Sequence, residues 1–213
     1  MPFVAAGRVT SNNVAQARIT HYLSLGTVPK YDLGRGYQLG SPNTLIIGDL
    51  RRMWWLRSRI HRAHYPAWIA LAANAPWGAL PVNAQLTALG SANQSYVSIR
   101  AAGFALFSHF YGQQRKEARV SKVLHLKRPD FFPILDRKVL ALYRPKLVNP
   151  PSNRLARVPL YWDLFRDDLL LSANQGALVN LRRWINAQVP GNAGFSVFLT
   201  LTDVRLFDIA ACW

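Results

Sequence analysis

Residues 120–139, which read VSKVLHLKRPDFFPILDRKV, hold the strongest local signals in the chain. The apolar spacing over residues 122–126 predicts one or two helical turns. Pro129 ends them, because proline cannot donate to the helical hydrogen-bond ladder, and Pro133 predicts a second corner. Asp136 then stands at the N-cap of a further helix, ahead of apolar residues with helical spacing. The segment therefore predicts two helices joined by a proline-rich turn.

Apolar periodicity predicts helices in much of the remaining chain. No alternation typical of strands is sustained, so the predicted class is all-α, with one compact helical domain over residues 1–213. Within it, residues 1–20 are expected to be a flexible arm or a short first helix, residues 26–44 a loop, and residues 144–160 a basic, proline-rich loop. The predicted helices cover residues 43–64, 67–74, 95–111 (buried and central), 161–172, 174–189 and 196–211.

The charge balance predicts an anionic partner. The 213 residues carry 26 Lys and Arg against 10 Asp and Glu, a net charge of +16. A compact protein with this charge repels itself unless a polyanion neutralises it, so DNA is the first candidate partner and an anionic membrane surface or the ribosome is an alternative.

The remaining composition bears on compartment and cofactors. A single cysteine, Cys212, excludes a disulfide framework within one chain and a zinc site built on thiolates. His61 and His64 lack a third metal-ligating neighbour in the sequence, so neither a metal nor another cofactor is expected. The N-terminus is too poor in apolar residues for a signal peptide, and prolines interrupt the most apolar stretch, residues 66–82. A cytoplasmic protein without a membrane partner is therefore predicted.

Basic residues cluster where a nucleic-acid backbone could be bound. On the predicted helix 43–64, one face is rich in arginine, with a tryptophan at its centre that is suited to stacking on a base. A solvated basic face is the alternative. The candidate DNA contacts on this face and around the central segment are Arg51, Arg52, Trp55, Arg59, Arg62, Arg115, Lys116, Arg119, Lys127 and Arg128.

Lys122 and Asp136 are the candidate catalytic pair. If both side chains face one cleft, a lysine amine with a lowered pKa can attack the C1′ carbon of a nucleotide and form a Schiff base. The carboxylate can stabilise positive charge on the sugar or orient a water molecule. The alternative is that Asp136 only caps a helix and Lys122 only contacts phosphate. The aromatic candidates for wedging or stacking during base flipping are Trp54, Trp55, Phe131 and Phe132.

Residues 121–139 take part in two resemblances. Together with Tyr31-Asp32, Asp49-Leu50 and the C-terminal segment from Val204 to Asp208 with Trp213, they resemble a bacterial protein family of about this size. More locally, the run from Lys122 to Asp136 resembles the helix-hairpin-helix DNA glycosylases. It differs from them at residues 117–120, where the hairpin glycines are missing, and at Leu135, where valine is usual.

The second resemblance implies a helix-hairpin-helix DNA glycosylase-like fold, with Lys122 as nucleophile and Asp136 as catalytic carboxylate. The implied enzyme flips a damaged or modified base and cleaves its N-glycosidic bond, with or without lyase activity. Its role would be in repair or in defence against phage with modified DNA. The alternative function is a non-catalytic DNA- or RNA-binding protein that keeps the same scaffold and charge.

Overall fold

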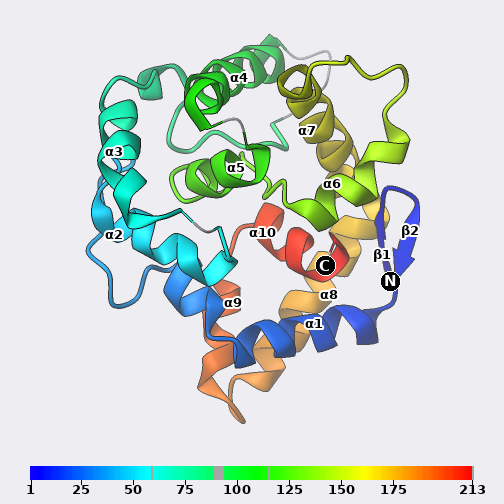
Figure 1. Ribbon diagram of the computed structural model, residues 1–213. Coiled ribbons are helices and arrows are strands. Elements are labelled where there is room, and N and C mark those ends of the chain that lie inside the picture. The colour runs from blue at the N-terminus through cyan, green and yellow to red at the C-terminus, as the bar shows by residue number, and fades with distance from the viewer. Residues whose placement is uncertain (59, 89–93, 115, 213) are drawn as a thin grey trace.

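The computed structural model of the protein describes residues 1–58, 60–88, 94–114 and 116–212 and is mostly helical (Figure 1). This confirms the predicted all-α class. In chain order the helices are α1 (Asn12–Ser24), α2 (Ile47–Arg52), α3 (Tyr65–Ala73), α4 (Gln94–Gln114), α5 (Glu117–His125), α6 (Arg137–Tyr143), α7 (Arg154–Leu170), α8 (Ser172–Gln188), α9 (Ser196–Leu199) and α10 (Asp203–Phe207). Short 3-10 or π-helical turns are η1 (Val28–Asp32), η2 (Met53–Leu56), η3 (Arg62–His64), η4 (Trp77–Ala79), η5 (Arg144–Lys146), η6 (Ala193–Phe195) and η7 (Asp208–Cys212).

A small antiparallel hairpin precedes the first helix. Its strands are β1 (Phe3–Ala5) and β2 (Arg8–Thr10), and the turn between them places Ala6 and Gly7 at positive φ. Asn174 of α8 bonds both the amide and the carbonyl of Val4, which fixes the hairpin to the body of the protein. The first 20 residues are therefore not a free arm, whereas the alternative of a short first helix agrees with α1.

The central helices enclose an aromatic core. Phe131 and Phe132 are fully buried and each packs edge-on against Trp162 of α7. On α4, Gly103 gives Phe131 room, because a Cβ at that position would lie 2.3 Å from the Phe131 ring. The helix predicted over residues 95–111 is confirmed as α4, but it is not a buried central helix: Val97 is exposed, and α4 lies at the margin of the molecule in Figure 1.

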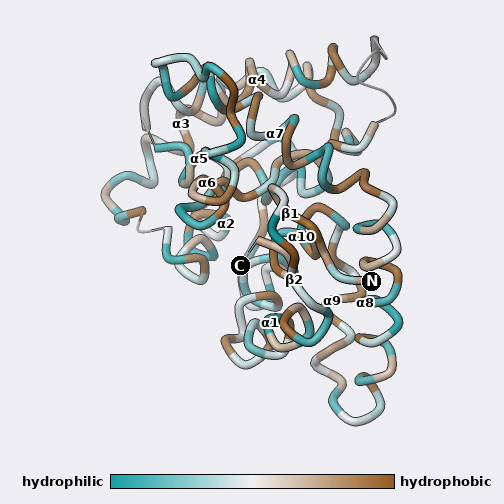
Figure 2. Tube along the Cα trace, turned by 90° about the vertical axis from the view of Figure 1, so that its right-hand side faces the viewer, coloured by the Kyte–Doolittle hydropathy of each residue, from teal (hydrophilic) through white to brown (hydrophobic). Residues whose placement is uncertain are grey.

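The C-terminal segment lies in the middle of the molecule. In Figure 1, α10 lies among α5, α6 and α8, and in Figure 2 hydrophobic residues gather around α10. Every residue of α10 after Asp203, and every residue of η7, is buried. A single helix over residues 196–211 was predicted, but the chain breaks after α9, where the Thr202 side chain accepts a hydrogen bond from the Arg205 amide and caps α10.

The predicted helix over residues 43–64 is wrong. α2 ends at Arg52, η2 continues it for one tighter turn, and Arg57 then adopts left-handed backbone angles (φ 53°) that end the helical path. A helical wheel drawn across this break no longer describes which side chains share a face. Trp54, on η2, is 73% exposed.

The predicted loop over residues 144–160 is too long. The Asn153 side chain accepts a hydrogen bond from the Leu155 amide, and α7 begins at Arg154. Pro159 lies inside this helix, where its ring removes one amide donor from the first turns without ending them. In the described part of the chain, no helix is long and apolar enough to cross a lipid bilayer.

Candidate active site

Lys122 and Asp136 line one cavity of about 330 Å³. α5 carries Lys122, and Asp136 is the residue that opens α6. The condition that both residues belong to one cleft is therefore met in the structure. The other residues around the cavity include Tyr22 of α1, Trp55 of η2 and Arg57 after it, Lys138 of α6 and Arg205 of α10.

The amine of Lys122 is nearly removed from solvent. The residue is 8% exposed, and its Nζ donates to the Leu56 carbonyl over 2.7 Å. That carbonyl is available because the chain turns away from helical geometry at Arg57. Burial lowers the pKa of Lys122, Arg205 lowers it further, and the carboxylates of Asp136 and Asp208 oppose the change. A lysine with a lowered pKa has a larger neutral fraction and is the better nucleophile.

Asp136 is the N-cap of α6, as predicted. Its Oδ1 accepts hydrogen bonds from the amides of Lys138 (2.8 Å) and Val139 (3.1 Å). These two amides hold the carboxylate at the edge of the cavity and stabilise its negative charge. The cap and the position beside Lys122 are therefore properties of the same side chain, and neither excludes the other.

A buried ionic cluster lies directly behind the cavity. The Arg205 guanidinium donates to Asp32 Oδ1 over 2.8 Å and to Asp208 Oδ2. His125 Nε2 lies 3.8 Å from Asp32 Oδ1, and His125 Nδ1 lies 2.7 Å from the Phe132 carbonyl. These side chains are at most 4% exposed. The cluster joins α5, α10 and the π-helical turn η1, and so fixes the walls that present Lys122.

Burial shifts the titration of this cluster. It raises the pKa of Asp208 to about 7 and also raises that of Asp32, because a charged carboxylate is disfavoured away from water, although the nearby Arg205 guanidinium opposes both changes. Burial, helped by the charges of Arg205 and Arg52, lowers the pKa of His125 to about 3. A neutral His125 then carries its proton on Nδ1, since that nitrogen faces the Phe132 carbonyl, which only accepts.

We expect the free energy of unfolding of His125→Asn to depend less on pH below pH 6.5 than that of wild type. The unfolded chain binds a proton at His125 below pH 6.5, whereas the folded protein does not bind it until about pH 3. His125 therefore contributes stability in full above pH 6.5, and that stability is lost as the pH falls. Between pH 6.5 and 5, wild type should lose about 2 kcal/mol relative to the variant. Asparagine keeps an amide donor for the Phe132 carbonyl.

Urea denaturation of both proteins at pH 7, 6 and 5 measures this difference. The opposite effect of Asp208, whose raised pKa makes the protein less stable as the pH rises toward 7, is present in both chains and cancels. Parallel curves for the two proteins would contradict the neutral, buried state of His125.

Three residues predicted to contact DNA are buried structural residues. The Arg52 guanidinium donates to the carbonyls of Tyr31 and Asp32, and Lys127 pairs with Asp49 at 2.8 Å. Arg128 is 0% exposed and donates to the distant carbonyls of Pro42, Trp77 and Leu80 and to the Asn43 side chain. The prediction is wrong for Arg52, Lys127 and Arg128, because folded chain segments, not phosphates, supply their acceptors.

The remaining residues predicted to contact DNA differ in how far their side chains are exposed to solvent. Arg51, Arg62 and Lys116 are exposed, whereas Arg119 is half-buried and donates to the Ser58 carbonyl. Trp55 is half-buried, and its indole N–H donates to Tyr37 Oη over 2.9 Å. Arg59, Arg115 and Trp213, named above, lie outside the described residues.

Sequence reasoning missed Tyr22 and Arg57 as residues of the cavity. A second cavity of about 430 Å³ shares Trp55 and Arg57 with the first and adds the exposed Trp54 at its edge. It also missed the role of Arg205. One signal was present for that residue: Arg205 and Asp208 are opposite charges three residues apart inside an apolar stretch, which is typical of a buried pair.

Comparisons of the chain with protein families, with curated proteins and with solved structures gave no match. Within the described residues, no group of three or more His, Cys, Asp or Glu side chains is arranged to bind a metal ion. His61 and His64 have rings 6.3 Å apart and are exposed.

Proposed function

We propose that the protein is a helix-hairpin-helix DNA glycosylase-like enzyme that flips a damaged or modified base and cleaves its N-glycosidic bond. The observation that carries the proposal is the shared cavity of Lys122 and Asp136. A nucleophilic amine and a carboxylate are the two groups that this reaction uses, and here they face one space near the lower end of the size range of ligand pockets. The cellular role is repair, or defence against phage whose DNA carries modified bases.

The reaction follows from the two side chains. Neutral Lys122 attacks C1′ of the flipped nucleotide, and the bond from C1′ to the base breaks with its electron pair leaving on the base, which takes up a proton. Loss of a proton from the attached nitrogen and opening of the sugar ring give an imine, which water hydrolyses to an abasic site. The carboxylate of Asp136 stabilises the positive charge that develops on the sugar ring. Alternatively, Asp136 alone orients the attacking water and Lys122 contacts a phosphate.

Aromatic residues at the entrance suit base flipping. Trp54 is exposed at the edge of the adjoining cavity, and Trp55 lines both cavities. A tryptophan that reaches solvent beside a pocket can replace the stacking partner that a flipped base loses. Phe131 and Phe132 are excluded from this role because both are fully buried in the core. The net charge of +16 attracts the DNA backbone.

The direct test is base release from DNA. Purified protein is incubated with genomic DNA from several bacteria and phages, including phages with modified bases. Released bases are identified by mass spectrometry, and abasic sites are counted with an aldehyde-reactive probe. We expect abasic sites on one class of DNA. Salt-sensitive binding without base release on any DNA would contradict the enzymatic proposal.

Reductive trapping separates the two roles of Lys122. Borohydride delivers hydride to the imine and converts it to a stable amine, so wild type should become covalently attached to its substrate DNA. Lys122→Gln should form no adduct and release base at least about a hundredfold more slowly. Full base release without an adduct in either protein would make Lys122 a phosphate contact and leave the chemistry to Asp136 and water. Lys138→Gln, which alters a lysine at the same cavity, is the matched control.

A non-catalytic DNA- or RNA-binding protein is the second candidate. It is favoured by the internal partners of both residues, since Lys122 bonds the Leu56 carbonyl and Asp136 caps α6. Under this function Lys122→Gln and Asp136→Asn change stability at most, and nucleic-acid affinity depends on the exposed basic residues.

A further inference from the structure

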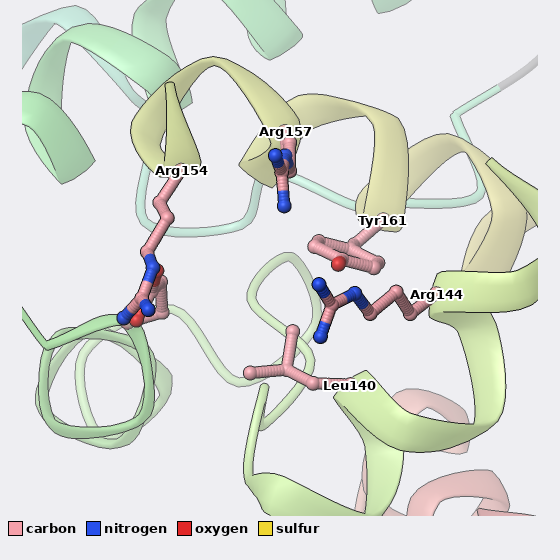
Figure 3. Close-up of a pocket in the computed structure, with 6 residues that line it drawn as sticks. Leu140, Arg144, Arg154, Arg157 and Tyr161 are labelled. Atoms are coloured by element: carbon pink, nitrogen blue, oxygen red, sulfur yellow. The ribbon is translucent and has the colours of Figure 1, made fainter. Parts of the chain in front are cut away.

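A separate cavity of about 240 Å³, away from the two described above, is surrounded by arginines. It lies between α6 with η5 on one side and the start of α7 on the other, and its lining is Glu117, Leu140, Arg144, Arg154, Arg157 and Tyr161. In Figure 3 the guanidinium groups of Arg144 and Arg157 point into the same space beside the Tyr161 ring, while Arg154 lies on the opposite side near α5. None of these residues lines the cavity of Lys122 and Asp136.

The charges around this cavity do not balance. Three guanidinium groups face one carboxylate, that of Glu117, which leaves a local charge of about +2 if all four groups are ionised. Two of the arginines belong to the first turns of α7, whose first turn has no acidic residue. The amide groups at a helix N-terminus repel cations and attract anions. An anion in the cavity would relieve both sources of repulsion.

One of the three arginines is held in place before any ligand arrives. Arg157 donates through Nε to the Pro151 carbonyl over 2.6 Å and through Nη2 to the Ser152 carbonyl over 3.1 Å. These bonds orient the guanidinium, and in Figure 3 the Arg157 side chain points into the cavity. A guanidinium that is already ordered loses less entropy when it binds an oxyanion.

There is space for more than the anion itself. An adjoining cavity of about 540 Å³ shares Glu117, Arg144 and Arg154 and adds the basic side chains of Lys116 and Arg137. Together the two cavities form a basic groove along α5, α6 and the start of α7. The side chain of Tyr161 supplies a ring face and a hydroxyl at the end of this groove that the smaller cavity forms.

We propose that Arg144, Arg154 and Arg157 form a phosphate-binding site. Guanidinium groups bind phosphate oxygens through paired, charge-assisted hydrogen bonds, and a phosphomonoester carries the charge of about −2 that the local excess matches. The phosphate belongs to a nucleotide, free or at the end or in the backbone of a nucleic-acid strand. The site does not depend on the proposed base release, because it shares no residue with the catalytic cavity.

Isothermal titration at constant ionic strength tests the site. The ligands are inorganic phosphate, a nucleoside 5′-monophosphate, and one oligonucleotide with either a 5′-phosphate or a 5′-hydroxyl end. We expect Arg157→Gln and Arg144→Gln each to weaken phosphate binding by about tenfold or more, since each removes a charge-assisted contact. Arg144→Gln is the safer variant for folding because its side chain is exposed. Arg183→Gln, an exposed arginine of α8 outside the groove, removes the same charge and should bind as wild type does.

The ligand series identifies the source of the phosphate. Preference for the 5′-phosphorylated strand or the free nucleotide assigns a phosphomonoester, whereas equal, arginine-dependent binding of both strands assigns the backbone. Binding that is the same in wild type, Arg144→Gln and Arg157→Gln for every ligand would overturn the site. Asp136→Asn should bind phosphate unchanged, so loss of base release and loss of this site are separate outcomes.

Discussion

Asp136→Asn should lower the rate of base release by a factor of about 10² to 10⁴ while the protein stays folded. The substitution removes the negative charge that stabilises the sugar cation or activates water. It keeps an amide oxygen at the place of Oδ1, which accepts hydrogen bonds from the amides of Lys138 and Val139. Asparagine and aspartate are equally good N-caps, so stability should change by less than about 0.5 kcal/mol.

Single-turnover base release, DNA affinity and urea denaturation should therefore be measured on the same preparations. Asp136→Ala is the matched control, because it removes both the charge and the cap and should cost about 0.5–2 kcal/mol of stability in addition to activity. DNA affinity of Asp136→Asn should remain within a few-fold of wild type. Full activity in Asp136→Asn would reduce Asp136 to a helix cap and leave the chemistry without its carboxylate.

Arg205→Met should destabilise the protein by about 3–5 kcal/mol, the largest loss expected for a residue outside the reaction itself. Methionine fills similar space, so the loss comes from charge and not from a cavity. Without the guanidinium, Asp32 and Asp208 keep two buried carboxylates with no cation paired to them. Removing one partner of a buried pair costs more than removing both, because the remaining charge stays desolvated.

Arg182→Met is the control for this prediction. Arg182 also pairs with an aspartate, Asp203, at 2.6 Å, but the two side chains are 31% and 48% exposed. An exposed pair contributes about 0–1 kcal/mol, so this variant should unfold close to wild type in urea. Adding Asp208→Asn to Arg205→Met should restore part of the lost stability. A loss of less than about 1 kcal/mol for Arg205→Met would contradict the buried, paired state of the cluster.

Local sequence signals were sufficient to predict the helix ends in the segment around Asp136. A proline after Arg128 ends one helical segment, and a side-chain acceptor at Asp136 begins the next, in the sequence and in the structure alike. Both effects act within a few residues and depend only on backbone donors and acceptors. The shared cavity of Lys122 and Asp136 was only a supposition from the sequence, and the folded structure brings the two residues to one space.

The positions of the long basic side chains could not be predicted in this way. Arg128 takes its acceptors from Leu80, 48 residues away, and from Pro42, 86 residues away. Arg205 donates a hydrogen bond to Asp32, which lies 173 residues away in the sequence. A cluster of arginines looks the same in the sequence whether its hydrogen-bond acceptors are phosphates of a ligand or backbone carbonyls of a distant turn.

The helix assumed over residues 43–64 failed for a related reason. Its apolar spacing predicts a continuous helix. In the structure, however, Arg52 and Met53 are buried against η1, and Arg57 adopts left-handed backbone angles that end the helical path. The sequence by itself determined the helical class, the excess of positive charge and the capped turn at Asp136. Only the tertiary structure decided which cations are buried, because that depends on which distant carbonyls and carboxylates the folded chain brings within hydrogen-bonding distance.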